Sequence, residues 1–206
     1  MFPRPCLMLV TDRHQCRGDL VQAVAAAVEG GVHAVQLREK DLLTAELITL
    51  GASLKRVMGG APLLVNDATD VAIAVGADGL HLPENGMSIK PGRLLLPPSA
   101  LIGRSVHSVQ SALAAEAEGA DYLIYGNVYE TGSHPGAPAA GLDRLREVVS
   151  TVKVPVLAIG GVTAARVPEI MAAGAAGVAV ISAVLSSPDP RKAASDLRVA
   201  VRRAAL

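Results

Sequence analysis

The sequence predicts a single (β/α)8 barrel, and three observations support this fold class. Short apolar runs alternate with longer, Ala-rich segments of helical spacing along the chain of 206 residues. The apolar runs lack the polar–apolar alternation of a sheet with one wet face, so we expect parallel strands that are buried on both faces. The units number eight, which favours a closed barrel over the alternative, an open doubly wound sheet.

The elements follow one another without a segment that would mark a linker. The expected strands are the apolar runs at residues 6–11, 34–38, 62–66, 79–82, 101–106, 122–126, 155–160 and 177–182. The expected helices lie near residues 19–30, 44–58, 68–76, 87–95, 108–118, 141–151, 165–174 and 190–203. The residues expected as helix N-caps are Asp19, Thr44, Asp67, Ser108 and Thr163. Similar turns, such as G-A-D-G-L and G-A-D-Y-L, indicate repeated units, so we expect one domain over residues 1–206.

Composition and charge exclude several classes of partner. Lys and Arg together number 19, as do Asp and Glu, and aromatic residues are only 2% of the chain, so we expect no nucleic-acid partner. The longest stretch of low polarity, residues 172–185, is too short and too rich in glycine to cross a bilayer. Cys6 and Cys16 have the spacing of neither a disulfide framework nor a metal site. We therefore expect a cytoplasmic protein with no membrane partner.

Polar residues that close the apolar runs are the candidates for a functional site, because barrel enzymes bind their substrates at the C-terminal ends of the strands. Gln36, Arg38 and Lys40 stand at alternate positions and therefore face the same way. Two cations beside an amide suit a diphosphate or a carboxylate ligand. The alternative is a solvated loop in which Arg38 pairs with a neighbouring glutamate.

Two further groups of strand-end residues suit phosphate chemistry. Asp67 follows a strand and could bind a hard cation such as Mg²⁺, or it could only cap the next helix. Gly160, Gly161, Ile181 and Ser182 end the last two strands, whose loops commonly form a phosphate cradle in such barrels. Simple turn glycines are the alternative interpretation of the first two.

Eight segments taken together resemble one family, the thiamine phosphate synthases and thiazole tautomerases of thiamine biosynthesis. The resemblance extends over nearly the whole chain and lies in LVTD (9–12), QLREK (36–40), LLVND (63–67), GADGLHL (76–82), IGRSVHS (102–108), GADYLIYG (119–126), AIGGV (158–162) and GVAVIS (177–182). The family fold is a small (β/α)8 barrel, which agrees with the number of units in the chain.

The resemblance to the synthase branch implies a transferase that joins a hydroxymethylpyrimidine diphosphate to a thiazole phosphate and releases pyrophosphate. The residues that it implies for the pyrimidine diphosphate are Gln36, Arg38, Lys40, Asn66 and Ser105. Those that it implies for the thiazole phosphate are Thr131, Ser133, Gly161, Ile181 and Ser182. Asp67 would bind Mg²⁺ in a synthase.

Two positions depart from the synthase pattern. Similar synthases read H-L-G-Q-x-D after the fourth strand, where the Asp is a second Mg²⁺ ligand, but this chain has Gly86 there. They also carry a lysine in the long loop where this chain has His134. Both groups would neutralise the leaving pyrophosphate, so their absence argues against an efficient synthase. Glu84 could replace the missing carboxylate.

The segments S-V-H-S (105–108) and E-T-G-S (130–133) resemble the tautomerase branch, which isomerises the thiazole synthase product to an aromatic carboxythiazole phosphate without a metal. Its proposed acid/base histidine corresponds to Asn127, and a neutral amide does not titrate near pH 7. The remaining candidate proton carriers are His107, His134 and Glu130. His81 is either a base or a hydrogen-bonded wall residue.

We expect the tautomerase, an isomerase that needs no cofactor. The alternative is thiamine phosphate synthase with Mg²⁺ at Asp67. A third hypothesis is a catalytically silent, phosphate-binding regulator that keeps the cradle and lacks the acid/base group. In all three cases the partner is a small-molecule phosphate, and a homo-oligomer is left open.

Overall fold

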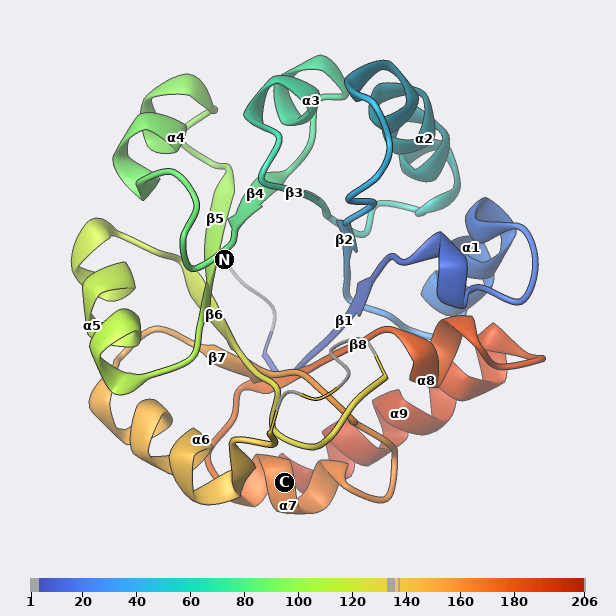
Figure 1. The fold of residues 1–206 in the computed structure, drawn as a ribbon. Coiled ribbons are helices and arrows are strands. Elements are labelled where there is room, and N and C mark those ends of the chain that lie inside the picture. The colour runs from blue at the N-terminus through green and yellow to red at the C-terminus, as the bar shows by residue number, and fades with distance from the viewer. Residues whose placement is uncertain (1–3, 133–135, 137, 206) are drawn as a thin grey trace.

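The computed structural model describes residues 4–132, 136 and 138–205 and is a closed barrel surrounded by helices (Figure 1). Within these residues, eight parallel strands follow one another around the barrel in chain order, and the last pairs with the first. The strands are Cys6–Val10 (β1), Ala34–Leu37 (β2), Leu63–Asn66 (β3), Gly79–Leu82 (β4), Leu101–Val106 (β5), Tyr122–Tyr125 (β6), Val156–Ala158 (β7) and Gly177–Val180 (β8). The predicted barrel is confirmed, and the open sheet is wrong.

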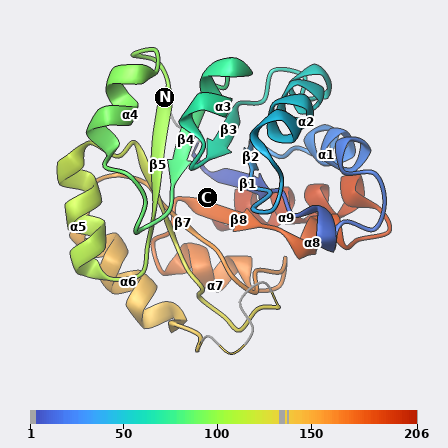
Figure 2. The ribbon, with the colours of Figure 1, turned by 45° about the horizontal axis from the view of Figure 1, so that its top comes forward.

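Helices cover the outside of the barrel in both ribbon views (Figures 1 and 2). They are Arg13–Gln15 (η1, a 3-10 helix), Leu20–Glu29 (α1), Thr44–Val57 (α2), Thr69–Ala74 (α3), Ile89–Leu95 (α4), Val109–Glu118 (α5), Gly141–Thr151 (α6), Val167–Ala172 (α7), Ser182–Leu185 (α8) and Pro190–Ala204 (α9). Each expected helix is present. The sequence did not predict η1 and α8, two short helices that follow β1 and β8. None of the helices in the described residues is long and apolar enough to cross a membrane.

Two of the five expected N-caps are confirmed. The side chains of Asp19 and Ser108 each accept a backbone N–H in the first turn of the following helix. The other three expectations, for Thr44, Asp67 and Thr163, are wrong, because the N-cap positions fall on Leu43, Ala68 and Arg166. At Leu43 the Glu46 carboxylate accepts the backbone N–H at 2.8 Å, which is the bond that the N3 side chain makes in a capping box.

Alternate side chains of a strand pack on opposite sides of the barrel wall. In β1, Cys6, Met8 and Val10 belong to the cluster that fills the barrel, whereas Leu7 and Leu9 pack with the helices. Other members of the inner cluster are Ala34, Leu64, Tyr122, Ile124, Leu157 and Ala179. Because side chains fill the interior, a ligand has room only beyond the strand ends.

Candidate functional site

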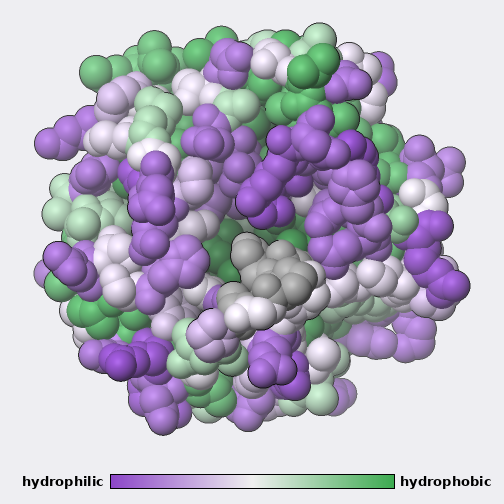
Figure 3. Space-filling model, viewed as in Figure 1, coloured by the Kyte–Doolittle hydropathy of each residue, from purple (hydrophilic) through white to green (hydrophobic). Residues whose placement is uncertain are grey.

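A cavity of about 670 Å³ opens at the C-terminal ends of the strands. Figure 3 shows hydrophilic residues around the centre of this face. The predicted site residues that line the cavity are Gln36, Arg38, Lys40, Asn66, Asp67, Ser105, His107, Asn127, Thr131, Gly160, Gly161, Ile181 and Ser182. Glu130 is exposed and is not among the lining residues. Ser133 and His134 lie outside the described residues, so their roles stay predictions.

Gln36, Arg38 and Lys40 line one side of this cavity. Gln36 is only 2% exposed, and its Nε2 has no hydrogen-bond partner within the described chain. The side chains of Arg38 and Lys40 form no hydrogen bond or ion pair with another described residue. Burial lowers the pKa of Arg38, and the nearby carboxylates of Asp12 and Glu39 oppose this effect. These unsatisfied donors suit an anionic ligand with several acceptor oxygens.

The alternative interpretation of this segment, an Arg38 neutralised by the neighbouring glutamate, is wrong. The buried carboxylate of Glu39 instead accepts the backbone N–H of Arg13 at 3.0 Å and approaches the Arg13 guanidinium at 3.3 Å. The guanidinium of Arg38 is thereby left for the cavity.

A hydrogen-bonded chain of Tyr122, His81 and Ser105 rises from the barrel interior to the cavity. The His81 Nδ1 lies 3.0 Å from the Tyr122 hydroxyl, and Nε2 lies 2.9 Å from the Ser105 hydroxyl. Burial, with further contributions from Arg104 and Arg38, lowers the pKa of His81 to about 3. The ring is therefore neutral near pH 7, with one nitrogen that donates and one that accepts. Of its two predicted roles, the wall residue fits better, because both nitrogens are engaged in fixing neighbours.

Asp67 does not cap the helix that follows it. Its backbone has φ +62°, and α3 starts after Ala68. Its carboxylate accepts no hydrogen bond from another described residue and faces the cavity. A non-glycine residue in this left-handed conformation costs of the order of 1 kcal/mol, and such residues cluster at functional sites. The geometry favours a binding role for Asp67.

The loop between β4 and α4 is held by Arg104 from β5. Its guanidinium donates to the backbone carbonyls of Pro83, Glu84 and Met87 at 3.0, 3.1 and 2.7 Å. In this conformation a Cβ atom on Gly86 would lie 2.8 Å from the Pro83 ring. The loop therefore has no room at this position for the aspartate of similar synthases.

The carboxylate of Glu84 is also engaged. It accepts the backbone N–H of His107 at 3.0 Å and lies 2.9 Å from His107 Nδ1. Burial raises the pKa of Glu84, but the hydrogen bonds from Ser111 and His107 outweigh it and hold this pKa below its ordinary value. Glu84 is thus a partner of His107, which argues against its use as a replacement metal ligand and ties up the His107 ring.

The residues that line the cavity supply one ligand for Mg²⁺ and not a complete set. In the described part of the chain, no three His, Cys, Asp or Glu side chains gather closely enough to hold a metal ion. Mg²⁺ does not need such a cage, since it commonly takes one or two carboxylates and completes its shell with phosphate oxygens and water. Asp67 beside the cations supplies one carboxylate, so the donor set suits Mg²⁺ that arrives with a diphosphate.

The opposite side of the cavity is made of backbone turns. Gly160 and Gly161 have φ of +99° and +61°, which L side chains rarely adopt. A Cβ on Gly161 would lie 2.6 Å from the Glu130 carbonyl oxygen, so the turn requires glycine. The short helix α8 begins at Ser182 beside this turn, as in barrels that bind phosphate after the seventh and eighth strands.

Sequence reasoning missed the apolar floor of the cavity. Ile124, Ile159 and Ala179 line it and belong to, or pack against, the apolar cluster that fills the barrel. Within strands such residues look like ordinary core, and only the register of the barrel shows that they face a ligand. Apolar surface beside two anion sites suits a flat heterocycle with a phosphate at either end.

Comparison with known proteins identifies the family to which the chain belongs. The model of the family described as thiamine monophosphate synthase matches residues 7–184. The chain belongs to this family. It is 45% identical to a thiamine-phosphate synthase of Methanoculleus marisnigri over 199 residues, which cover 93% of each chain. A thiamine-phosphate synthase of Roseiflexus sp. is 40% identical and covers 95% of this chain and 85% of its own.

A solved structure supports the same family. Thiamine phosphate pyrophosphorylase from Pyrococcus furiosus superimposes with a TM-score of 0.88 at 40% identity, over 97% of this chain and 96% of its own. These names overturn our expectation of a thiazole tautomerase, an isomerase, and favour the transferase. The expectation gave too much weight to two missing charges, at Gly86 and His134. It gave too little to Arg38 and Lys40, two cations in the cavity lining that suit a diphosphate.

Proposed function

We propose that this protein is a thiamine-phosphate synthase, which joins a hydroxymethylpyrimidine diphosphate to a thiazole phosphate. The observation that carries the proposal is the set of relatives with that name, at 40% and 45% identity over 95% and 93% of this chain. The cavity supports it, since cations, a glycine turn and an apolar floor line the same cavity. Two phosphorylated substrates would meet over that floor.

The reaction breaks the bond between the pyrimidine methylene carbon and the diphosphate oxygen, and the electron pair leaves with pyrophosphate. The lone pair of the thiazole nitrogen forms the new bond to the same carbon. Arg38 and Lys40 would hold the diphosphate and stabilise the negative charge that grows on it. The Gln36 amide and the Ser105 hydroxyl, the latter fixed by His81, would orient the pyrimidine diphosphate.

Asp67 and Asn66 stand at the end of β3 beside these cations. Mg²⁺ bound by Asp67 and the diphosphate would supply additional positive charge to the leaving group. At the other end, the turn at Gly161 and the start of α8 at Ser182 would bind the thiazole phosphate. Ordered in this way, the thiazole nitrogen and the methylene carbon would face one another above Ile124.

The test is pyrophosphate release by the purified protein with each substrate alone and with both, in the presence of Mg²⁺ or of EDTA. We expect pyrophosphate and the coupled product in equal amounts, only with both substrates. Arg38→Gln should lower the rate by about 10²-fold or more. The matched control is Arg144→Gln on α6, since Arg144 is exposed, pairs with Glu147 and is not in the cavity lining.

Two outcomes would contradict the proposal. No pyrophosphate from the wild-type protein with both substrates and Mg²⁺ would overturn it. Saturable binding of both ligands without reaction would support the silent, phosphate-binding regulator instead. An equal loss of rate in the Arg38 and Arg144 variants would overturn the role of Arg38.

A further inference from the structure

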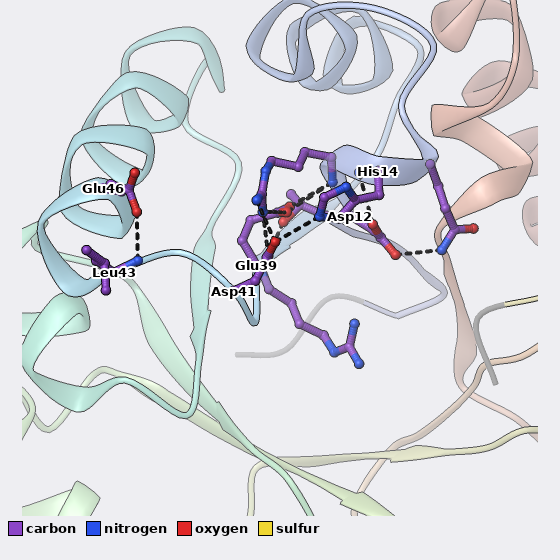
Figure 4. Close-up of polar contacts among 10 residues, drawn as sticks. Asp12, His14, Glu39, Asp41, Leu43 and Glu46 are labelled. Carbon is purple, nitrogen blue, oxygen red and sulfur yellow. Dashed lines mark hydrogen bonds and ion pairs between the residues drawn. The ribbon is translucent and has the colours of Figure 1, made fainter.

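The segment after β2 carries cations and carboxylates in alternation. Arg38, Glu39 and Lys40 line the cavity, whereas Asp41 is not among the lining residues. Figure 4 shows Glu39 and Asp41 close to the segment that carries Asp12 and His14, on the loop after β1. The side chains of Arg38 and Lys40 have no hydrogen-bond or ion-pair partner among the described residues, whereas the carboxylate groups of Glu39 and Asp41 make their contacts with a different loop.

Arg13 of η1 holds both carboxylates. Its guanidinium forms a two-pronged pair with Asp41, with N–O distances of 2.5 and 2.6 Å. Its backbone N–H donates to both oxygens of Glu39, at 3.2 and 3.0 Å. His14 adds a contact of 2.9 Å to Asp41. We call Arg13 with Glu39 and Asp41 the Arg13 clamp.

A second contact fixes the backbone of the same segment. The backbone N–H of Arg38 donates to the hydroxyl of Thr11, a fully buried residue directly after β1, at 2.9 Å. Arg38 itself lies beyond the last residue of β2, Leu37, so no strand ladder orders its side chain. The position of the two cations thus depends on contacts with the loop after β1.

The clamp also determines which charged side chains are available to the ligand. Without the Arg13 side chain, the Asp41 carboxylate keeps only its contact with His14 among the described residues. It is then free to turn towards Lys40 or Arg38. A carboxylate that pairs with Lys40 or Arg38 would cancel the charge that is available to a phosphate ligand.

The Arg13–Asp41 pair contributes little to global stability, because Asp41 is 52% exposed and exposed ion pairs are worth only about 0–1 kcal/mol. The Glu39 carboxylate is buried, but it keeps the backbone N–H of Arg13 when only the Arg13 side chain is changed. The main effect of the clamp is local.

We propose that Arg13 is a positioning residue for diphosphate binding, which engages the carboxylates of Glu39 and Asp41 and leaves Arg38 and Lys40 to the ligand. The inference rests on the proposed function, since it takes the ligand of these cations to be a diphosphate. Arg13 is not among the cavity-lining residues, so it acts through its neighbours.

The test is isothermal titration of the purified protein with inorganic pyrophosphate. We expect Arg13→Gln to weaken binding by about tenfold or more, because one misdirected cation and one released carboxylate both act against the anion. The double variant Arg13→Gln with Asp41→Asn should recover most of this loss, since the released carboxylate is gone. Arg144→Gln is the matched control, and it should bind like the wild type.

Steady-state kinetics and stability separate positioning from a general structural role. In Arg13→Gln we expect the KM for the pyrimidine diphosphate to rise while the KM for the thiazole phosphate and the melting temperature stay close to wild type. Arg13→Lys keeps the charge but cannot form the two-pronged pair. Its KM for the pyrimidine diphosphate should therefore lie between those of the wild type and Arg13→Gln. It also serves as the second variant if Arg13→Gln folds poorly.

The outcomes are distinguishable. Wild-type affinity in Arg13→Gln, or a double variant that is no better than the single one, would overturn the clamp and leave the proposed function intact. A parallel rise of both KM values with a lower melting temperature would also overturn it. No pyrophosphate binding by the wild type at millimolar concentration would overturn the diphosphate site and the clamp together.

Discussion

The buried histidine of the Tyr122–His81–Ser105 chain predicts a measurable dependence of stability on pH. The pKa of His81 falls from its ordinary 6.5 to about 3 in the folded protein, first because of burial and then because of Arg104 and Arg38. The unfolded chain therefore binds more protons than the folded one between these values. The contribution of neutral, buried His81 to the free energy of unfolding is therefore complete above pH 6.5 and is lost as the pH falls towards 3.

The size of the effect follows from the two pKa values. At pH 5 an unfolded histidine is almost fully protonated, whereas folded His81 is neutral, so the linkage removes about 2 kcal/mol relative to pH 8. His33 adds to the same trend, because burial and Arg198 also lower its pKa. The pKa values of Glu84 and Glu118 are below their ordinary 4.5. The titration of these carboxylates therefore affects the free energy of unfolding mostly below about pH 5.

Urea unfolding of wild-type protein and of His81→Gln at pH 8 and pH 5 measures this term. We expect His81→Gln to be less stable at pH 8, because a buried hydrogen-bonded group is altered, but to lose about 2 kcal/mol less than the wild type between the two pH values. His14→Gln is the control, since the His14 side chain is 67% exposed. Equal losses in wild type and His81→Gln would refute the reasoning.

Two glycine substitutions test the packing of the site. Gly103→Ala would put a Cβ 2.0 Å from the Tyr122 ring, so it should lower the free energy of unfolding by about 1–3 kcal/mol, while Gly92→Ala on α4, with its nearest contact at 3.4 Å, should not. Gly161→Ala, at φ +61°, should raise the KM for the thiazole phosphate about tenfold more than the KM for the diphosphate. Gly18→Ala, whose Cβ meets nothing within 4 Å and which is not in the cavity lining, is its control. If Gly161→Ala and Gly18→Ala have the same KM for the thiazole phosphate, the glycine turn does not bind this phosphate.

The barrel was predictable because its signal is repeated. Each run of buried strand residues and each helix that follows it gives the same local pattern, so an error at one end of one element does not change the topology. The same reasoning located most of the site, because strand ends of a barrel meet at one face. Thirteen of the predicted site residues line one cavity, although they come from loops that are far apart in the chain.

The parts that failed depend on exact contacts rather than on pattern. Asp67 looks like an N-cap in the sequence, but its backbone turns to φ +62° and the helix starts later. Glu84 looks like a spare carboxylate, but His107 from the next loop holds it. Neither result can be read from spacing, because each is set by a neighbour from a different strand.

The error about the reaction has a related cause. A missing aspartate at Gly86 was treated as a lost charge, yet the cavity's charge depends on the arrangement of groups as well as on their number. The run Arg38–Asp41 is neutral in sequence, with cations and acids in alternation. The fold gives the cations to the cavity, and the Arg13 clamp takes up the acids. Glu39 also lines the cavity, so alternation alone does not remove the acids from an anion site. The contacts of Glu39 and Asp41 with Arg13 on the neighbouring loop engage these carboxylates instead.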